Sequence, residues 1–154
     1  MPDRSPNPDS PSAEELRDLS CTLSARPVQR DLMVTRLQFV ADLLADSGPL
    51  PQAPLLLWRG TDGTVRQVTI ENEVVVGREP GGQGLALTED KMLSRRHFAV
   101  RSKDGECSVE DLKSHNGTAV NEAAARVDKQ RLHDGDLIFA GNQVFAFLDH
   151  RRSN

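Results

Sequence analysis

Three short polar motifs carry chemistry in this chain, and each follows or interrupts a run of apolar residues. They are Gly77-Arg78, Ser94-Arg95-Arg96-His97 and Ser114-His115-Asn116-Gly117-Thr118. Together they supply a guanidinium group, a hydroxyl group, the backbone N–H groups of turns and a side-chain amide. A guanidinium group presents paired donors that match two phosphate oxygens, and an amide both donates to and accepts from an extended peptide. The motifs therefore predict a site that holds a phosphate group beside a peptide backbone.

The same motifs permit a second interpretation, in which Ser94 and His97 are the nucleophile and the base of a hydrolase. The two residues are close in sequence at the entry to a predicted strand, but no third residue is placed to orient the imidazole. We expect His97 instead to bond the loop backbone and to fix Ser94. The sequence therefore predicts a binding protein with no catalytic residue and no cofactor.

Composition limits the classes of function further. The chain has 154 residues, a net charge of -4 and a pI of about 5.5, whereas a general nucleic-acid-binding protein usually carries a basic excess. Cys21 and Cys107 form no CxxC pair and the four histidines are scattered, so we expect no metal site. No apolar run is long enough to span a membrane, and the polar N-terminus does not resemble a secretory signal. We expect a cytoplasmic protein that binds neither nucleic acid nor membranes.

Composition and periodicity divide the chain into five segments. Residues 1–12 are rich in proline and offer almost nothing apolar to bury, which predicts a disordered tail. Residues 13–48 show helical spacing, and residues 49–53 form a proline-containing linker. Residues 54–150 form the main domain, and residues 151–154 form a short C-terminal tail.

The helical extension predicts two helices. Ser12 and Glu15 fit a capping box at the start of the first helix, and Pro27 fits the first turn of the second, which runs to about residue 46. An apolar stripe of the second helix consists of Met33, Leu37, Val40 and Leu44, flanked by Phe39 and Leu43. We expect this stripe to pack on the main domain. In one alternative, the helix dimerises or docks on a partner. In another, a phosphorylated Thr22 or Thr35 is captured by the chain's own loops, and Thr22 is better placed because Thr35 lies within the predicted helix.

The main domain shows the short period of β-strands. Asp62-Gly63 and Asp104-Gly105 separate apolar runs and favour hairpins, because both residue types tolerate positive φ. A third Asp-Gly follows at Asp134-Gly135, and Gly141-Asn142 separates the last two runs. The predicted strands are Leu55–Trp58, Val65–Ile70, Val74–Val76, Leu85–Leu87, Phe98–Val100, Cys107–Leu112, a strand starting at Thr118, Arg126–Leu132, Leu137–Phe139 and Val144–Phe147. Many short strands at this spacing predict an all-β sandwich.

The order and spacing of the three motifs, with Asn121 after them, resemble those of the forkhead-associated (FHA) domain. Leu132-His133-Asp134-Gly135-Asp136 is similar to the closing turn of that family, and the resemblance covers roughly residues 54–149. It implies an eleven-stranded β-sandwich that binds phosphothreonine peptides through loops at one end. Four positions depart from the family pattern: Gln83, Gly84, Met92 and His115.

The resemblance also implies a role for each motif residue. Arg78 and Ser94 match positions that contact the phosphate, Arg95 matches a further ligand contact, and Asn116 matches the residue that holds the ligand backbone. His115 belongs to the same loop, so we include it in the expected ligand-binding set. The positions that match structural residues of the family are Gly77, His97, Gly117, Thr118 and Asn121.

We therefore expect a phosphothreonine-peptide binding module that acts as a signalling adaptor or regulator downstream of Ser/Thr kinases. Its partners would be a kinase or the proteins that the kinase phosphorylates. The alternative is a scaffolding or dimerisation protein of the same fold, which recognises an unphosphorylated partner partly through the N-terminal helices. A homodimer through the N-terminal helix is compatible with either function.

Overall fold

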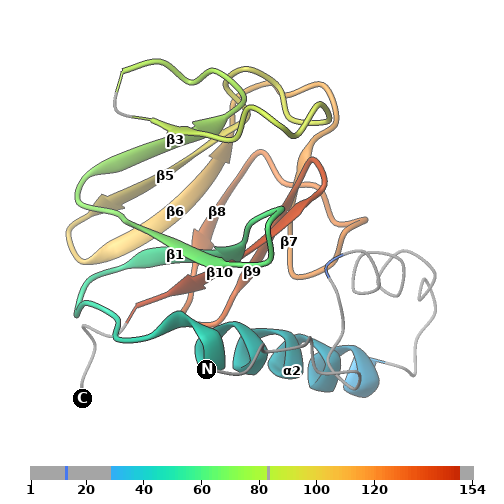
Figure 1. The fold of residues 1–154 in the computed structure, drawn as a ribbon. Coiled ribbons are helices and arrows are strands. Elements are labelled where there is room, and N and C mark those ends of the chain that lie inside the picture. Colours follow the sequence, from blue (N-terminus) through green and yellow to red (C-terminus); the bar gives the residue numbers. More distant parts are fainter. Residues whose placement is uncertain (1–12, 14–28, 83, 150–154) are drawn as a thin grey trace.

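The computed structural model describes residue 13, residues 29–82 and residues 84–149. Its described part consists of ten strands in two five-stranded sheets, preceded by one long helix, α2 (Gln29–Ser47) (Figure 1). The first sheet has the order β2 (Val65–Thr69), β1 (Leu55–Arg59), β10 (Gln143–Leu148), β9 (Leu137–Ala140) and β7 (Thr118–Val120). The second has the order β4 (Leu85–Ala86), β3 (Glu73–Gly77), β5 (Phe98–Lys103), β6 (Glu106–Asp111) and β8 (Lys129–Leu132). The predicted β-sandwich is confirmed, with ten strands in the described residues where eleven were expected.

Two of the Asp-Gly pairs close hairpins, as predicted. β1 pairs with β2 around Asp62-Gly63, and β5 pairs with β6 around Asp104-Gly105. Asp104 has a φ of 54° and Gly105 a φ of 80°, which fits a turn that right-handed strand twist favours. The third pair, Asp134-Gly135, instead connects β8 to β9, which lie in different sheets. This connection carries the chain from one layer of the sandwich to the other.

The core between the sheets is apolar and centred on aromatic rings. Trp58 and Phe145 of the first sheet have ring centroids 5.6 Å apart, and Phe145 lies 5.5 Å from Phe98 of the second sheet. Both contacts are tilted or edge-on, the arrangement that aromatic rings favour. Trp58 keeps its indole Nε1 buried without a hydrogen-bond partner among the described residues.

Helix α2 covers the outer face of the first sheet (Figure 1). Leu32, Phe39 and Leu43 of the helix are buried against an apolar cluster that includes Leu55 and Leu57 of β1. Apart from its edge strand β2, where Arg66 and Gln67 are exposed, the first sheet is therefore buried on both faces. This explains why β1 is a continuous apolar run, since a strand that alternates between core and solvent would alternate in polarity.

The predicted packing stripe of this helix was wrong. Met33, Leu37 and Leu44 are exposed, with 53%, 63% and 39% of their surface accessible, and Val40 is half-buried. The buried stripe is the neighbouring one, formed by Leu32, Phe39 and Leu43. Apolar residues occur on two adjacent faces of this helix, so periodicity alone could not select the buried face. The predicted first helix, with Ser12, Glu15 and Pro27, lies outside the described residues, as do Thr22, the 1–12 tail and the 151–154 tail.

The outer face of the second sheet is polar. Arg101 of β5 forms ion pairs with Glu73 of β3 and Glu110 of β6. Burial alone would lower the pKa of Arg101, but its hydrogen bonds and charge contacts with the two carboxylates raise it above the ordinary value. The two faces of the domain thus differ: α2 covers one, and charged side chains cover the other. No helix in the described part of the chain is long and apolar enough to cross a membrane.

Candidate phosphopeptide site

The three sequence motifs meet at the end of the sandwich that lies away from α2 (Figure 1). Gly77 ends β3, the second motif precedes β5, and the third connects β6 to β7. Because β3 and β5 are neighbours in the second sheet, Gly77 and the Ser94–His97 segment lie side by side. The loop is fixed to β3 by backbone bonds from Arg78 N–H to the Ser94 carbonyl, 3.0 Å, and from Glu79 N–H to the Arg95 carbonyl, 3.1 Å.

Gly77 is required by this close approach. A Cβ atom built on it would lie 2.1 Å from the carbonyl oxygen of Arg95 and 2.8 Å from that of Ser94. Both obstacles are backbone atoms held in hydrogen bonds, so they cannot move aside as a flexible side chain would. The structural role expected for Gly77 thus has a specific physical reason.

Arg78 lies half-buried at the entrance to the site. Its Nε donates a hydrogen bond of 2.8 Å to the carbonyl oxygen of Leu93. This bond orients the guanidinium plane and leaves the terminal Nη nitrogens for another acceptor. An arginine held in this way loses less conformational freedom when it binds a phosphate.

His97 joins the second and third motifs beneath the surface. It is fully buried, and its Nδ1 accepts a hydrogen bond of 3.0 Å from the Ser94 N–H. Since Nδ1 accepts, the proton of the neutral ring belongs on Nε2, which donates to the Gly117 carbonyl at 2.8 Å. Both ring nitrogens are therefore used by backbone groups. The imidazole is not bonded to the Ser94 hydroxyl, so the geometry does not form the nucleophile–base pair of a hydrolase.

Two further contacts tie the loops together at the surface. The backbone N–H of His115 donates to Ser94 Oγ at 2.9 Å, and Asn116 Nδ2 donates to the Met92 carbonyl at 2.9 Å. Ser94 Oγ thus accepts from the protein, while its own hydrogen can still be donated. Asn116 retains its amide oxygen and one N–H. The side chain of His115 is exposed, so its backbone rather than its imidazole connects it to the other motifs.

Asp111 organises the third motif and was missed in the sequence. One carboxylate oxygen accepts from Ser114 N–H at 3.1 Å, and the other accepts from the hydroxyl groups of Ser114 and, at 2.8 Å, Thr118. Ser114 Oγ in turn accepts from Gly117 N–H at 3.0 Å. The sequence did contain a signal for this role. An acidic residue at a strand end, three positions before a serine, is the pattern of a turn capped by a side chain.

Asn121 acts at the other end of β7, away from the loops that carry the three motifs. Its Oδ1 accepts from Leu137 N–H at 2.9 Å, and its Nδ2 donates to Asp136 at 3.1 Å. Asp136 also accepts from His133 N–H at 2.8 Å, within the predicted closing turn. Asn121 has a φ of 65°, which asparagine tolerates better than most residues. It therefore braces β7 against the turn before β9.

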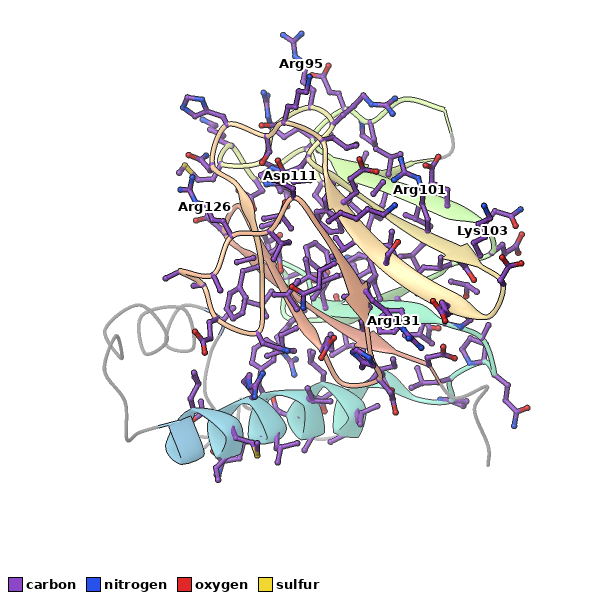
Figure 2. All side chains as sticks on the ribbon, turned by 180° about the vertical axis from the view of Figure 1, so that it is seen from behind. Arg95, Arg101, Lys103, Asp111, Arg126 and Arg131 are labelled. Atoms are coloured by element: carbon purple, nitrogen blue, oxygen red, sulfur yellow. The ribbon has the colours of Figure 1, made fainter. Side chains whose placement is uncertain are left out.

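The basic residues of the domain differ in whether they are paired. Arg59, Arg66, Arg101 and Arg131 form ion pairs with carboxylates. Arg95 is exposed at the tip of the loops, at the top of Figure 2, and none of the described carboxylates pairs with it. Arg78 likewise has no carboxylate partner among the described residues. The cations left available therefore include the two that belong to the predicted site.

Comparison with known proteins agrees with this geometry. The sequence profile of the FHA domain matches residues 74–141. The chain is 34% identical over 104 residues to the oxoglutarate dehydrogenase inhibitor of Corynebacterium efficiens, an alignment that covers 68% of this chain and 70% of that protein. The chain belongs to the FHA domain family. It is also 32% identical over 106 residues to the glycogen accumulation regulator GarA of Mycolicibacterium smegmatis, covering 69% of this chain and 65% of GarA.

Solved FHA domains share the fold. One, described in a structural and functional analysis of phosphothreonine-dependent FHA domain interactions, is 31% identical, with a TM-score of 0.53 over 64% of this chain and 97% of that one. Another, the FhaA FHA domain complexed with the intracellular domain of Rv3910, is 30% identical, with a TM-score of 0.51 over 62% of this chain and 99% of that one. Helix α2 lies outside residues 74–141, the range that the FHA profile matches.

Proposed function

We propose that this chain is a phosphothreonine-peptide binding module that regulates other proteins downstream of Ser/Thr kinases. The observation that carries the proposal is the convergence of three unused donors at one end of the sandwich. These are the terminal nitrogens of Arg78, the hydroxyl hydrogen of Ser94 and the free N–H of Asn116, and each group is held by a bond to the loop backbone. Arg95 adds an unpaired cation at the same end. Donors held in place before the ligand arrives suit this ligand: those of Arg78 and Ser94 suit the phosphate, and the amide of Asn116 suits the peptide backbone.

The magnitudes fit this assignment. A phosphate group carries about -1.5 to -2 charges at pH 7, and each charge-assisted hydrogen bond to it contributes about 1.5–3 kcal/mol. Two or three such bonds offset the cost of ordering a flexible peptide and leave an affinity on the order of micromolar. A carboxylate has less charge and fewer oxygens, so Asp or Glu should replace phosphothreonine poorly.

We expect phosphorylation to increase peptide affinity by about 100-fold or more, because two charge-assisted bonds are gained. The test is an oriented library of phosphothreonine peptides, followed by calorimetry on the best sequence. The affinities of three peptides of that sequence are compared: one with phosphothreonine, one with unmodified threonine and one with glutamate at the same position. Equal affinity for the phosphorylated and unmodified forms would contradict the proposal and favour the scaffolding alternative.

We propose no enzymatic activity for the chain. The relatives are named as an inhibitor and a regulator, and His97 is not available as a base for Ser94 because both of its ring nitrogens bind backbone groups. We propose that the chain acts by occupying a surface of its phosphorylated partner. A cytoplasmic location is part of this proposal, and it is supported by the cysteine usage of the sequence, because two cysteines without a CxxC pair fit a reducing compartment.

We also propose that the chain forms a homodimer through α2. The supporting observation is the apolar face of the helix turned away from the sheet, where Met33 and Leu37 are 53% and 63% exposed. Packing two such faces in an isologous contact would remove them from water.

We expect Leu37→Glu to shift the chain toward the monomer, because it places a charge in the centre of that contact. Sedimentation velocity over a range of concentrations measures the effect. Gln130→Glu is the matched control, since it adds the same charge at an exposed position of β8 in the other sheet. A wild-type chain that stays monomeric at the highest concentration would refute the dimer and leave the phosphopeptide proposal intact.

A further inference from the structure

An open pocket of about 340 Å³ begins at Asn116 and extends across the edge of the first sheet. Met92 and Asn116, from the two ligand-facing loops, line one part of it. Phe139 and Asn142, from β9 and the turn that follows it, also line the pocket, as does Arg126. A peptide whose backbone is held by Asn116 would therefore pass the mouth of this pocket within a few residues of its phosphothreonine.

Arg126 is positioned on Gly117, the residue next to Asn116. A Cβ atom built on Gly117 would lie 2.8 Å from both Cδ and Nε of Arg126 and 3.2 Å from its Cζ. The arginine thus occupies the space that any other side chain would take, and the φ of +85° at Gly117 also favours glycine. The backbone of Arg126 bridges to Ala119 of β7. These contacts hold the guanidinium group beside the ligand-facing loops, although Arg126 lies ten positions beyond Asn116 in the sequence.

The charge of Arg126 is not neutralised by the described residues. Among those that line the pocket it is the one charged side chain, and no described carboxylate forms an ion pair with it. Asp90, which is bonded to two pocket residues, accepts hydrogen bonds from Met92 N–H at 2.9 Å and from the Asn142 N–H and Nδ2 at 2.7 and 3.1 Å. That carboxylate is therefore already held by three donors and is directed at those groups.

The pocket combines apolar walls with this single cation. Met92 and Phe139 suit the methylene groups of a side chain, and a guanidinium group suits a carboxylate at its end, which it can bind through two parallel hydrogen bonds. Glutamate and aspartate have this combination. An aliphatic side chain would leave Arg126 unpaired, and a lysine or arginine would be repelled.

We propose that Arg126 is a specificity-determining residue. It selects phosphothreonine peptides that carry an acidic residue near the phosphothreonine, in the part of the peptide whose backbone passes Asn116. This inference rests on the proposed phosphopeptide binding and identifies the ligand class more narrowly. Arg126 contacts the flanking acidic side chain, whereas Arg78 contacts the phosphate. Figure 2 shows Arg126 and Arg95 in the half of the molecule away from α2, whereas Arg131 lies nearer the helix.

The experiment uses the full chain and a parent phosphothreonine peptide whose neighbours are all alanine. Glutamate is placed in turn at each of the four positions on either side, and affinities are measured by fluorescence anisotropy for wild type, Arg126→Ala and Arg131→Ala. Arg131→Ala is the matched control, since it removes one exposed arginine from a site remote from the loops. Thermal unfolding of each variant establishes that it is folded.

We expect glutamate at one position, or two adjacent ones, to raise wild-type affinity about 2- to 5-fold, the upper part of the range for an exposed charge pair. Arg126→Ala should remove this gain and leave the affinity for the parent peptide within about twofold, while Arg131→Ala keeps the gain. Arg126→Glu should transfer the preference to lysine at the same position.

Three results would overturn the inference while leaving phosphopeptide binding established. In the first, the parent peptide binds, but Arg126→Ala does not change the effect of glutamate at any position. In the second, Arg126→Ala and Arg131→Ala lower the affinity for all peptides equally. In the third, a peptide with leucine at the Arg126-dependent position binds more tightly than the peptide with glutamate there. A parent peptide whose phosphorylation has no effect on wild-type affinity would instead refute the proposed function, and this inference with it.

Discussion

Arg78→Ala should lower the affinity for a phosphothreonine peptide by about 100-fold or more while the domain remains folded. The variant loses two charge-assisted hydrogen bonds to the phosphate, each worth about 1.5–3 kcal/mol. It also loses the bond from Nε to the Leu93 carbonyl, so the loop before Ser94 is held less firmly. Isothermal titration calorimetry measures the affinity, and chemical denaturation measures the free energy of unfolding.

Arg78→Lys separates charge from geometry. Lysine keeps the positive charge, but it cannot bond the Leu93 carbonyl and also present a planar pair of donors to the phosphate. We expect an affinity between those of Arg78→Ala and wild type. Arg131→Ala controls for the loss of one positive charge from the domain. A folded Arg78→Ala variant that binds as tightly as wild type would remove Arg78 from the site.

Gly77→Ala should destabilise the domain by about 3 kcal/mol or more, a value at the upper end for single substitutions. The added methyl group would meet the Arg95 carbonyl oxygen at 2.1 Å, so either β3 or the Ser94–His97 segment must move. Movement would stretch the bonds from Arg78 N–H to the Ser94 carbonyl and from His97 N–H to the Val76 carbonyl, now 3.0 and 2.9 Å. Chemical denaturation gives the loss of stability, and peptide titration gives the loss of affinity.

Gly60→Ala is the matched control for this prediction. Its Cβ atom would also meet a close neighbour, Arg66 Nε at 2.7 Å, but that atom belongs to a flexible side chain that can rotate away. We expect a change in stability below about 1 kcal/mol and unchanged peptide affinity. If Gly77→Ala lowered the free energy of unfolding no more than Gly60→Ala, the Ser94–His97 segment would have room to adjust. A glycine at position 77 would then not be needed for the close approach of this segment to β3.

Local patterns in the sequence were sufficient for the strands and hairpins. The Asp62-Gly63 and Asp104-Gly105 turns connect paired strands as predicted, because the φ angles that a turn needs depend on the residue types in the turn itself. The third Asp-Gly has the same local chemistry but joins two sheets. Whether a turn closes a hairpin depends on which strands pair afterwards, and residues far along the chain decide that.

The helix illustrates the same limit. Its length and amphipathic character follow from spacing, but two neighbouring faces are apolar enough to be buried. Leu32, Phe39 and Leu43 are buried because the outer face of β1, β10 and β9 meets them there. The choice between faces depends on shape and contact across layers, which hydrophobic periodicity does not contain.

The residues of the candidate site also fall into two groups, those that the sequence could predict and those that only the structure revealed. The candidate residues in the motifs could be predicted from type and spacing, since a phosphate site needs a guanidinium group, a hydroxyl group and turn N–H groups in loops at strand ends. Asp111 and Arg126 were not recognisable, because their roles arise from contacts made after folding: one collects the donors of the Ser114 turn, and the other lies over Gly117. Residue chemistry is a local property and can be read along the chain. The direction in which each group is held depends on segments that only the packed sandwich brings together.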